Sequence, residues 1–572
     1  MDSLYSSPYA LLAAYLSLIP ISLAIYRLYF HPLANVPGPR LAAITSFWYA
    51  CQVQKGQMGT FSVALHKKYG PAVRIRPDEV SFDTKEAMQT IYSGSQWIQK
   101  GDFYYAQSMN PGKIDWRFRR HKGDDFAING ELDPERYRGH RKNIGVIYSA
   151  SSVKKYSERL DAVMHRLIAK IRANDEAVCD LTDWVHFAVV ECLGAMTLNW
   201  SPGFIEDTSS HGHLNLSTQW WRQSSVFGML PSTTLIVQKW PILKPIISRL
   251  LGVNMRTPEG HVPFHPRVVS LIKQRASAFF AAIKSKPETP LLPAEPDMLS
   301  ELLQQTQKKD NWKPHFATSM AAINFLAGHE TTTTTAAWSL LMINSSPEVK
   351  ARVQAETTEH GDDFESCKFT QACIKEAQRV HPIGGLSFPR LVPAGAPLTL
   401  HGHVLPPGTT VGVNLPAMDI NPRNFGPDAA EYKPERWLES PETWRDLEKN
   451  SLAWGGGAHT CPGRNVAELI LGKLITALMR EFDIEVVRVP AEKERRSITY
   501  IGFGGHMLPQ LGSTGDGTDG LCPGAGVKGT DDDGTDESYS VSGAKLGNGG
   551  NGAAEAKGVH AGIEAKVVEE SA

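Results

Sequence analysis

The segment AAINFLAGHETTTTTAAWSLL (321–341) constrains the fold most, because apolar residues flank a short polar core on both sides. The pattern predicts a long buried helix. Its five consecutive threonines are poor helix formers, and a threonine hydroxyl can bond the carbonyl four residues back, which loosens a helix. For Thr331 that carbonyl belongs to Ala327, and Gly328 lies between them. We therefore expect a distorted turn with room for a small ligand beside Thr331 and Glu330; a strained but inert core helix is the alternative.

Helical periodicity predominates over strand-like alternation along the body of the chain. There is no internal repeat, and no GxGxxG motif opens a helix after a strand, as a dinucleotide-binding fold would require. The sequence therefore predicts one large domain over residues 31–511, mostly α with minor β. The clearest helical patterns cover 152–173, 316–343, 346–358, 368–380 and 463–482, and the strand-like segments are 72–76, 397–400, 410–414 and 483–487.

An apolar segment without charged side chains precedes this domain at residues 8–26. A helix of about 20 apolar residues crosses a bilayer, and membrane helices tolerate a kink such as Pro20 would cause. A secretory signal peptide would have a basic leader, whereas this chain begins Met-Asp-Ser. Residues 1–30 are therefore predicted to be a single transmembrane anchor. Arg27 and Arg40 follow the span, which places the body of the protein on the cytosolic side.

Composition separates the C-terminal end from the body and excludes several classes of protein. Residues 512–572 are rich in Gly, Asp, Ser and Ala, so they can bury too little apolar surface to offset chain entropy and are predicted to be a disordered tail. A formal net charge of −1 over 572 residues lacks the basic excess that is typical of nucleic-acid-binding proteins. The seven cysteines contain no CxxC pair, which argues against a disulfide framework or a zinc ribbon.

One of these cysteines lies in a loop of unusual composition, WGGGAHTCPGR (454–464). Glycine adopts backbone conformations that other residues resist, and it lets the backbone approach a ligand closely. Such a loop could bring amide N–H groups to the sulfur of Cys461, and hydrogen bonds to sulfur favour the thiolate. The loop therefore suits a thiolate ligand, with a glycine-rich turn that holds an incidental cysteine as the alternative. The tripeptide CPG recurs at Cys522 without the aromatic-glycine segment before it, and is interpreted as coincidence.

Two further segments combine acidic and basic residues. In KEAQRVHP (375–382), Glu376 and Arg379 are three residues apart and share one face of a helix. The segment YKPERWL (432–438) offers Arg436 as a third member. Such pairs are usually solvated, but a buried glutamate between two arginines would form a satisfied charge cluster, and breaking it would leave a buried charge unpaired.

In order along the chain, these segments read Ala-Gly-x-Glu-Thr, Glu-x-x-Arg, Pro-Glu-Arg-Trp and aromatic-x-x-Gly-x-x-x-Cys-x-Gly. In this order and spacing, the chain resembles the cytochrome P450 family of haem-thiolate monooxygenases over roughly residues 30–511. The segments HPLANVPGPR, AGHETT, KEAQRVHP and PERWL are similar to those of microsomal enzymes of filamentous fungi that act on secondary metabolites. The resemblance implies the cytochrome P450 fold after a single N-terminal transmembrane helix, with haem b as the cofactor.

The resemblance assigns roles to residues around the haem iron. It makes Cys461 the axial thiolate ligand, whose electron donation favours O–O cleavage. Glu330 and Thr331 are expected to deliver protons to bound oxygen. The loop residues expected to lie against the sulfur and the porphyrin are Trp454, where the family commonly has Phe, Gly457 and Gly463.

The resemblance also assigns residues to the edge of the haem. Arg390 in FPRLVP and Arg141 in RYRGHRK are each expected to bind a propionate, and Tyr137 stands four residues before Arg141, where the family often has Trp or His. His459 stands where the family usually has Arg, and a nearby propionate should raise the pKa of this histidine. The structural cluster behind the haem is expected to consist of Glu376, Arg379 and Arg436.

The function implied by the resemblance is insertion of one oxygen atom of O2 into a small hydrophobic substrate. Electrons would come from a separate NADPH–cytochrome P450 reductase, with cytochrome b5 as an optional second donor. The protein would be a single-pass protein of the endoplasmic reticulum membrane with a cytosolic catalytic domain. A haem-thiolate peroxygenase or isomerase, a xenobiotic-detoxifying hydroxylase and a non-enzymatic haem-binding membrane protein are the alternatives. Candidate wall residues of the substrate pocket are Asn324, Phe325, 384–388 and part of 103–120.

Overall fold

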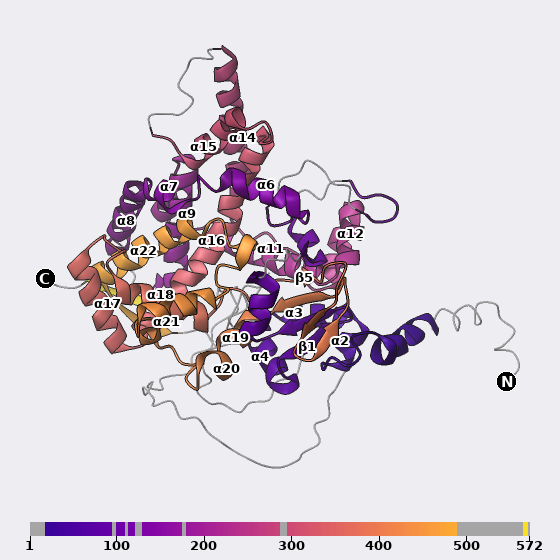
Figure 1. Cartoon of the computed structure of the whole chain (residues 1–572). Coiled ribbons are helices and arrows are strands. Elements are labelled where there is room, and N and C mark those ends of the chain that lie inside the picture. Colours follow the sequence, from indigo (N-terminus) through magenta and orange to yellow (C-terminus); the bar gives the residue numbers. More distant parts are fainter. Residues whose placement is uncertain are drawn as a thin grey trace, which may run out of the picture. The chain divides into compact units, whose positions relative to one another are not determined.

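The computed structural model describes residues 18–93, 99–108, 113–119, 128–173, 179–285, 295–488 and 564–569. Helices predominate in these ranges, and strands β1 and β5 lie beside the N-terminal helices α2 to α4 (Figure 1). The prediction of a mostly α fold with minor β is therefore confirmed.

Helices of more than ten residues form most of the described structure. They are α4 (Met58–Tyr69), α6 (Pro134–Ile144), α8 (Ser157–Arg172), α9 (Leu181–Leu198), α11 (His213–Gly228), α14 (Phe264–Ser285), α15 (Met298–Lys308), α16 (Pro314–Asn344), α17 (Pro347–His360), α18 (Lys368–Val380) and α22 (Arg464–Glu481). The shorter α-helices are α2 (Arg40–Ile44), α3 (Ser46–Lys55), α5 (Lys85–Met88), α7 (Ala150–Lys154), α10 (Phe204–Asp207), α12 (Pro231–Lys239), α13 (Lys244–Leu250), α19 (Leu415–Asp419), α20 (Pro422–Phe425) and α21 (Pro441–Lys449). The other helical turns are η1 (Tyr26–Phe30), η2 (Gln89–Ser93), η3 (Asp102–Gln107), η4 (Pro241–Leu243), η5 (Pro434–Trp437) and η6 (Gly457–His459).

The predicted helix boundaries agree with the structure except near residue 155. The pattern over 152–173 predicted one helix, but the chain forms α7 and α8, which are separated at Lys155 and Tyr156. Tyr156 has non-helical backbone angles and its carbonyl accepts the first bond of α8, from Leu160 N at 3.2 Å. Side-chain capping also determines where another helix begins. At the start of α6, the Asp133 carboxylate accepts hydrogen bonds from the amides of Glu135 and Arg136.

The long helix predicted from the alanine- and threonine-rich segment is α16. It packs against α9, α18 and α22. A Cβ atom on Gly328 would lie 3.1 Å from Leu193 Cδ2, so glycine leaves room for the Leu193 side chain of α9. The predicted distorted turn at Gly328 is wrong, because α16 runs as an α-helix without interruption. The threonine side chains add bonds to carbonyls four residues back, as in Thr331 Oγ1 to Ala327 O at 2.8 Å, without breaking the helix.

The main sheet has five strands in the order β1-β2-β8-β5-β3. Strand β2 runs parallel to β8, and the other neighbours are antiparallel. In the pairing of β3 with β5, Lys100 lies directly opposite Arg390. The sheet therefore places two basic side chains side by side from segments that are far apart in the sequence. The strands are β1 (Ala72–Arg76), β2 (Glu79–Phe82), β3 (Gln99–Lys100), β5 (Arg390–Leu391) and β8 (Thr410–Val413), with a separate hairpin of β6 (Leu398–Leu400) and β7 (His403–Leu405).

A second sheet joins the end of the domain to the C-terminal end of the chain. Its order is β4-β10-β9, where β4 is Cys179–Asp180, β9 is Phe482–Arg488 and β10 is Glu564–Glu569. Strand β10 lies inside the range 512–572, for which the sequence predicts a disordered tail. The rest of that range lies outside the described residues, so the division at residue 511 stays a prediction.

The predicted membrane anchor lies partly outside the described residues, which begin at residue 18. Leu18–Phe30 form an apolar helix that is too short by itself to count as a membrane span. The described helix that is long and apolar enough to cross a membrane is α9, but 83% of it is buried inside the fold. Helix α9 is therefore a core helix.

Candidate active site

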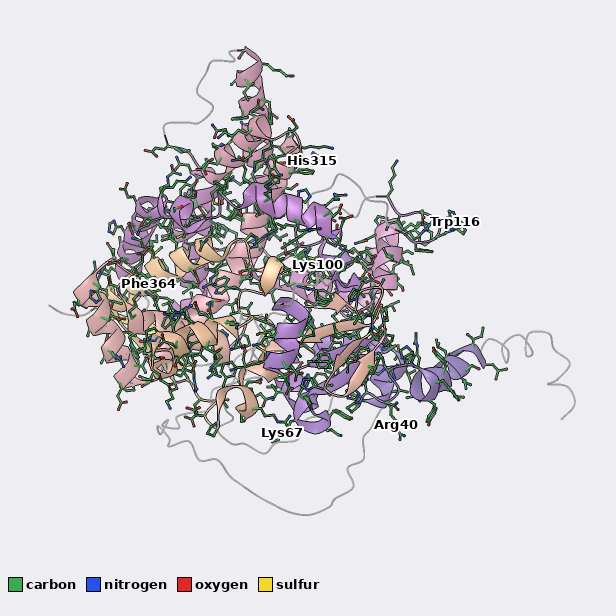
Figure 2. The ribbon with its side chains drawn as sticks, in the orientation of Figure 1. Arg40, Lys67, Lys100, Trp116, His315 and Phe364 are labelled. Carbon is green, nitrogen blue, oxygen red and sulfur yellow. The ribbon has the colours of Figure 1, made fainter. Side chains whose placement is uncertain are left out.

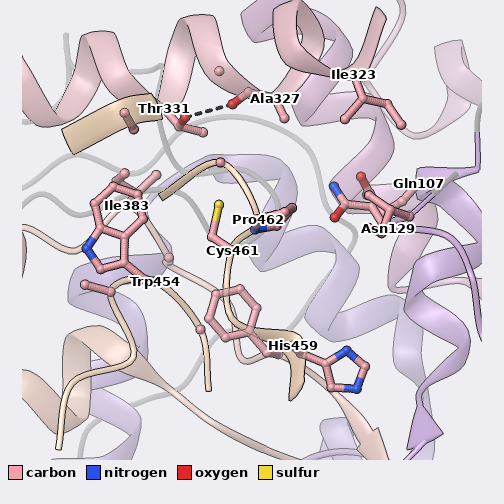
Figure 3. A pocket seen from close by; sticks show the side chains of 18 of the residues that line it. Gln107, Asn129, Ile323, Ala327, Thr331, Ile383, Trp454, His459, Cys461 and Pro462 are labelled. Atoms are coloured by element: carbon pink, nitrogen blue, oxygen red, sulfur yellow. Dashed lines mark hydrogen bonds between the residues drawn. The ribbon is translucent and has the colours of Figure 1, made fainter. Parts of the chain in front are cut away.

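A cavity lies between α16 and the loop that holds Cys461. In Figure 3 the sulfur of Cys461 points toward α16, where Thr331 and Ala327 form the opposite wall. Among the cysteines in the described ranges, only Cys461 lines this cavity. Trp454 lies beside the sulfur in the same view. The two segments that the sequence singled out for chemistry therefore face one another across one space.

The backbone of the cysteine loop depends on glycine. Gly455 and Gly457 have φ angles of 74° and 55°, which lie in the left-handed region. The loop is closed by a hydrogen bond from Cys461 N to Trp454 O at 2.7 Å. Gly463 follows the cysteine, lines the cavity and is the N-cap of α22. The loop thus turns back on itself and presents the sulfur just before a helix begins.

The electrostatics at the Cys461 sulfur combine opposing influences. Burial raises the pKa of the thiol, while the backbone amides of Gly463 and Arg464 and the charge of Arg141 act to lower the pKa. These amides belong to the N-terminal end of α22, where N–H groups favour a negative charge. A cation bound to the sulfur would complete this stabilisation, because metal binding deprotonates a coordinating thiol.

Thr331 and Glu330 occupy different faces of α16. Thr331 lines the cavity, whereas Glu330 does not. Glu330 is 5% exposed and accepts hydrogen bonds from two hydroxyls of α11, Ser217 Oγ to Oε2 at 2.7 Å and Thr218 Oγ1 to Oε1 at 3.1 Å. Burial raises the pKa of Glu330 to about 7, while hydrogen bonds from Ser217, Thr218 and Trp221 oppose the shift. Near neutral pH both protonation states are therefore populated, as a proton donor requires.

A group of basic side chains gathers at one edge of the cavity. Lys100, Arg390 and His459 line it, and Arg141 is close enough to influence the pKa values of Lys100 and His459. No ion pair within the described ranges involves Lys100, Arg141 or Arg390, and the buried Nη1 of Arg141 has no hydrogen-bond partner there. Buried charges are normally paired. This group therefore fits a ligand that carries two negative charges.

Tyr137 joins the basic group to the cysteine loop. Its ring is 4.7 Å from the His459 ring, and Lys100 Nζ lies 4.5 Å from the centre of the Tyr137 ring. Tyr137 lines the cavity and is 4% exposed. The aromatic residue four positions before Arg141 thus lies on the cavity wall beside His459, and its contact with haem stays a prediction.

The expected rise in the pKa of His459 beside a propionate stays a prediction, and the protein by itself acts in the opposite direction. Burial, followed by the charges of Arg390, Lys100 and Arg141, lowers the pKa of His459 to about 2. The sequence argument considered only a haem propionate. It did not include the charges of Lys100, Arg141 and Arg390, which the fold brings close to His459. A ring N–H of His459 can donate to a propionate, and Arg141 and Arg390 supply positive charge beside it.

Lys100 is the site residue that the sequence reasoning missed. It is 6% exposed, and its Nζ donates to the carbonyls of Ile128 and Asn129, both at 2.9 Å. Figure 2 shows Lys100 toward the middle of the molecule, while Arg40 and Trp116 lie at its periphery. Burial and the charge of Arg390 hold the pKa of Lys100 well below its usual range. The sequence offers no periodic signal here, because Lys100 acquires its role through the pairing of β3 with β5.

The charge cluster at Glu376 has the predicted geometry. Arg379 donates to both carboxylate oxygens, at 2.9 and 2.7 Å, and Arg436 Nε donates to Oε1 at 2.9 Å. The Lys433 amide and Trp437 Nε1 complete the shell at 3.0 and 2.9 Å. Although burial alone would raise the pKa of Glu376, the arginines hold it below its usual value. Glu376 is fully buried, so the cluster belongs to the core and not to a solvated surface.

The expected wall residues fall into two groups. Asn324, Gly384, Ser387 and Phe388 line the cavity, together with Phe103, Tyr104 and Gln107 from η3. Phe325 does not line it; its ring packs against Phe264, 5.8 Å away, because it lies on the core face of α16. The Asn324 side chain is held by Tyr148, whose hydroxyl donates to Oδ1 at 2.5 Å.

The cavity residues fit a haem. One wall supplies the Cys461 sulfur next to helix amides, and the opposite wall supplies apolar groups and the Thr331 hydroxyl. One edge supplies basic side chains that form no ion pair with a carboxylate within the described residues. A thiolate ligand for iron and cations for two propionates are what this cofactor needs.

Comparison with known proteins supports the same assignment. The cytochrome P450 family matches residues 37–502. Cytochrome P450 monooxygenase sdnT of Sordaria araneosa is 36% identical over 503 residues, covering 83% of this chain and 90% of the relative. A pisatin demethylase of Fusarium vanettenii is 27% identical, with coverage of 83% and 89%. Cytochrome P450 monooxygenase gsfF of Penicillium aethiopicum is 28% identical, with coverage of 82% and 91%.

Proposed function

Because the chain belongs to the cytochrome P450 family, we propose that it is a haem-thiolate monooxygenase in which Cys461 binds the iron. The observation that carries this assignment is that Cys461 alone among the described cysteines lines a cavity, opposite Thr331. Haem, when bound, supplies the iron chemistry that activates O2. Arg141, Arg390, Lys100 and His459 would hold its propionates. The cluster of Glu376, Arg379 and Arg436 keeps the core behind the cysteine loop in place.

Protons reach the cavity through α16. The Thr331 hydroxyl lies on the cavity wall, and its bond to Ala327 O fixes the direction of its oxygen (Figure 3). Glu330 lies one residue earlier and is held by Ser217 and Thr218 on α11. We assign Thr331 as the group that holds a proton at the cavity and Glu330 as the acid that resupplies it.

The substrate is a small and mainly apolar molecule with one group that accepts a hydrogen bond. Apolar side chains such as Phe103, Ile323 and Phe388 contribute much of the cavity lining. Gln107 adds a polar group: its Nε2 is buried and has no hydrogen-bond partner within the described ranges. A buried donor without a partner costs about 1–3 kcal/mol. A carbonyl or hydroxyl oxygen of the substrate would satisfy it.

The relatives guide the choice of substrates. One relative is a pisatin demethylase of Fusarium vanettenii, and two others are cytochrome P450 monooxygenases of Sordaria araneosa and Penicillium aethiopicum. For this chain we propose that the substrate is an oxygenated fungal secondary metabolite. Such a molecule has an apolar skeleton and a carbonyl or hydroxyl oxygen that can accept a hydrogen bond from Gln107.

Electrons are supplied by a separate NADPH–cytochrome P450 reductase, with cytochrome b5 as a second donor. Arg138 and Lys142 are exposed on α6, the helix whose Tyr137 contacts His459 in the cysteine loop. This basic surface lies next to the cysteine side of the cavity and would attract an acidic partner.

The function is tested by turnover of the holoprotein with such a reductase. A monooxygenase must form an oxygenated product that depends on NADPH, reductase and O2, and 18O2 must label the product. Product formed from hydrogen peroxide alone, or an isomerised product without 18O, would instead establish the peroxygenase or isomerase alternative. Haem binding without any turnover across a panel of fungal metabolites and xenobiotics would contradict the enzymatic assignment.

Thr331→Ala is expected to keep haem and substrate binding and to lower product per NADPH about tenfold or more. Loss of one positioned proton-transfer group typically costs roughly 10²–10⁴-fold in the step it serves, and electrons are then diverted to hydrogen peroxide. The measurement is product, peroxide and NADPH in the same reaction. Thr333→Ala is the matched control, because Thr333 makes the same bond to the carbonyl four residues back, at 2.7 Å, but does not line the cavity. Full coupling in Thr331→Ala would contradict the role.

The N-terminal region is proposed to anchor the protein in the endoplasmic reticulum membrane, with the catalytic domain on the cytosolic side. The helix over Leu18–Phe30 exposes large apolar side chains, including Ile19, Ile21 and Phe30. A second apolar surface is formed by Ile242 and Leu250 in η4 and α13, which are 81% and 80% exposed. Exposed apolar patches of this kind are typical of membrane-contact surfaces.

Deletion of residues 1–30 is expected to move most of the protein from the membrane pellet to the supernatant, with a remainder held by the second surface. Combining the deletion with Ile242→Ser and Leu250→Ser should release that remainder. Both forms are measured by haem absorbance after ultracentrifugation of lysates at low and high salt. An unchanged pellet fraction for the deletion, with an intact haem spectrum, would contradict the anchor.

A further inference from the structure

A group of buried histidines lies outside the active-site cavity, between α9, α11 and α16. His186 and His329 are fully buried and His213 is 1% exposed. One ring nitrogen from each of the three lies within 4.8 Å of the others. None of them lines the cavity described above. Three imidazoles from three helices are thus enclosed together in the core.

Hydrogen bonding fixes which nitrogen of His329 carries the free lone pair. Its Nδ1 lies 2.5 Å from Phe325 O, and since a carbonyl only accepts, Nδ1 carries the proton. Nε2 is then the unprotonated nitrogen, and Ser217 Oγ lies 2.8 Å from it. Histidine ligands of metals usually donate their other N–H to a carbonyl or carboxylate in this way, which orients the ring.

His213 is enclosed by aromatic side chains. Neither of its ring nitrogens has a hydrogen-bond partner within the described ranges, and its ring is surrounded by Phe264 at 4.5 Å and His265 at 5.0 Å. Buried polar side chains normally have partners, so an exception points to a missing ion or water.

We propose that His186, His213 and His329 form a binding site for a divalent transition-metal ion, best matched by Zn²⁺. Imidazole nitrogens suit this class of ion, and Zn²⁺ takes three histidines with a fourth, water-filled position. Tetrahedral Zn–N bonds of about 2.0–2.1 Å place ligand nitrogens about 3.4 Å apart. The three nitrogens lie within 4.8 Å of one another, so binding of the ion requires the imidazoles to move closer together. The site is separate from Cys461, and the proposal does not depend on the monooxygenase assignment.

Occupancy of this site affects a helix that serves the active site. An ion would link α11 to α9 and α16, and α11 supplies the Ser217 and Thr218 hydroxyls that hold Glu330. Binding at His329 Nε2 would also replace the contact from Ser217 Oγ and leave that hydroxyl to Glu330 alone. The histidine group is therefore positioned to stabilise the arrangement of the proposed proton donor.

The test uses the haem-containing protein equilibrated with micromolar Zn²⁺ and freed of unbound ion by gel filtration. Elemental analysis is expected to give one zinc per haem in wild type. His213→Phe and His186→Phe should retain the spectrum of the carbon monoxide complex but lose this zinc, because Phe matches the aromatic neighbours and lacks the ligand nitrogen. His315→Gln, at an exposed histidine of α16, should keep it.

A second measurement does not depend on the variants. Zinc-edge X-ray absorption of the wild-type protein should show three imidazole ligands. Equal zinc content in wild type and both Phe variants, fewer than three imidazoles, or no retained zinc would each overturn the proposal.

Discussion

Cys461→Ala is expected to abolish the red-shifted Soret band of the ferrous carbon monoxide complex and all NADPH-dependent product formation. The band reports a thiolate opposite carbon monoxide, and no other described cysteine lines the cavity. Haem should still bind in part, because the basic group at the cavity edge and the apolar walls are unchanged. The expected readout is therefore a protein that contains haem but lacks the thiolate spectrum.

Two cysteine variants serve as controls for this result. Cys51→Ala changes a partly buried residue of α3, and Cys522→Ala changes the second CPG tripeptide, which lies outside the described residues. Both should keep the band and the activity. Persistence of the band in Cys461→Ala would show that another residue supplies the ligand, and the assignment of this loop would then be wrong.

Glu376→Gln is expected to have the second largest effect, a loss of stability of about 3–5 kcal/mol. The carboxylate accepts five hydrogen bonds, two of them from Arg379 and one from Arg436. Glutamine keeps the shape but removes the charge and places an NH2 group among donors. Because total stabilities are about 5–15 kcal/mol, the variant should unfold at much lower urea concentration and accumulate with little haem.

The pH dependence of this effect follows from the lowered pKa of Glu376. A glutamate whose pKa is lower in the folded than in the unfolded state stabilises the fold above the unfolded pKa, and this stabilisation is lost as pH falls through the folded pKa. The difference in free energy of unfolding between wild type and Glu376→Gln should thus be largest near neutral pH and become smaller in acid. Glu442→Gln is the matched control, since its pair with Arg445 is exposed. Equal urea midpoints for wild type and Glu376→Gln at pH 7 would contradict the structural role.

Several local features could be predicted from the sequence alone. Helix α18 and strand β1 have the predicted bounds, because apolar periodicity and nearby proline or glycine residues determine such elements within a few residues. The bond from Thr331 to Ala327 follows in the same way, since both groups lie on adjacent turns of one helix. The order of the four motifs indicated the cytochrome P450 family, which the match over residues 37–502 confirms.

Other features depended on which segments the fold brings together. Lys100 joined the site only through the pairing of β3 with β5, and the same pairing brings to His459 cations that lower its pKa in the protein itself. Phe325 was placed on the wrong side of α16, because periodicity shows that a face is apolar but not whether it meets a cavity or another helix.

The histidine group shows most clearly the difference between features that follow from the local sequence and features that follow from packing. His186, His213 and His329 have no common motif, and they meet because α9, α11 and α16 pack around one point. The sequence by itself determined the cysteine loop, helix α16 and the pairing of Glu376 with Arg379, since each depends on residues that are close in the chain, whereas Arg436 joins that pair from 60 residues away. Only the tertiary structure decided the neighbours of buried charges and imidazoles, because electrostatic interactions depend on distances in space and not on positions in the sequence.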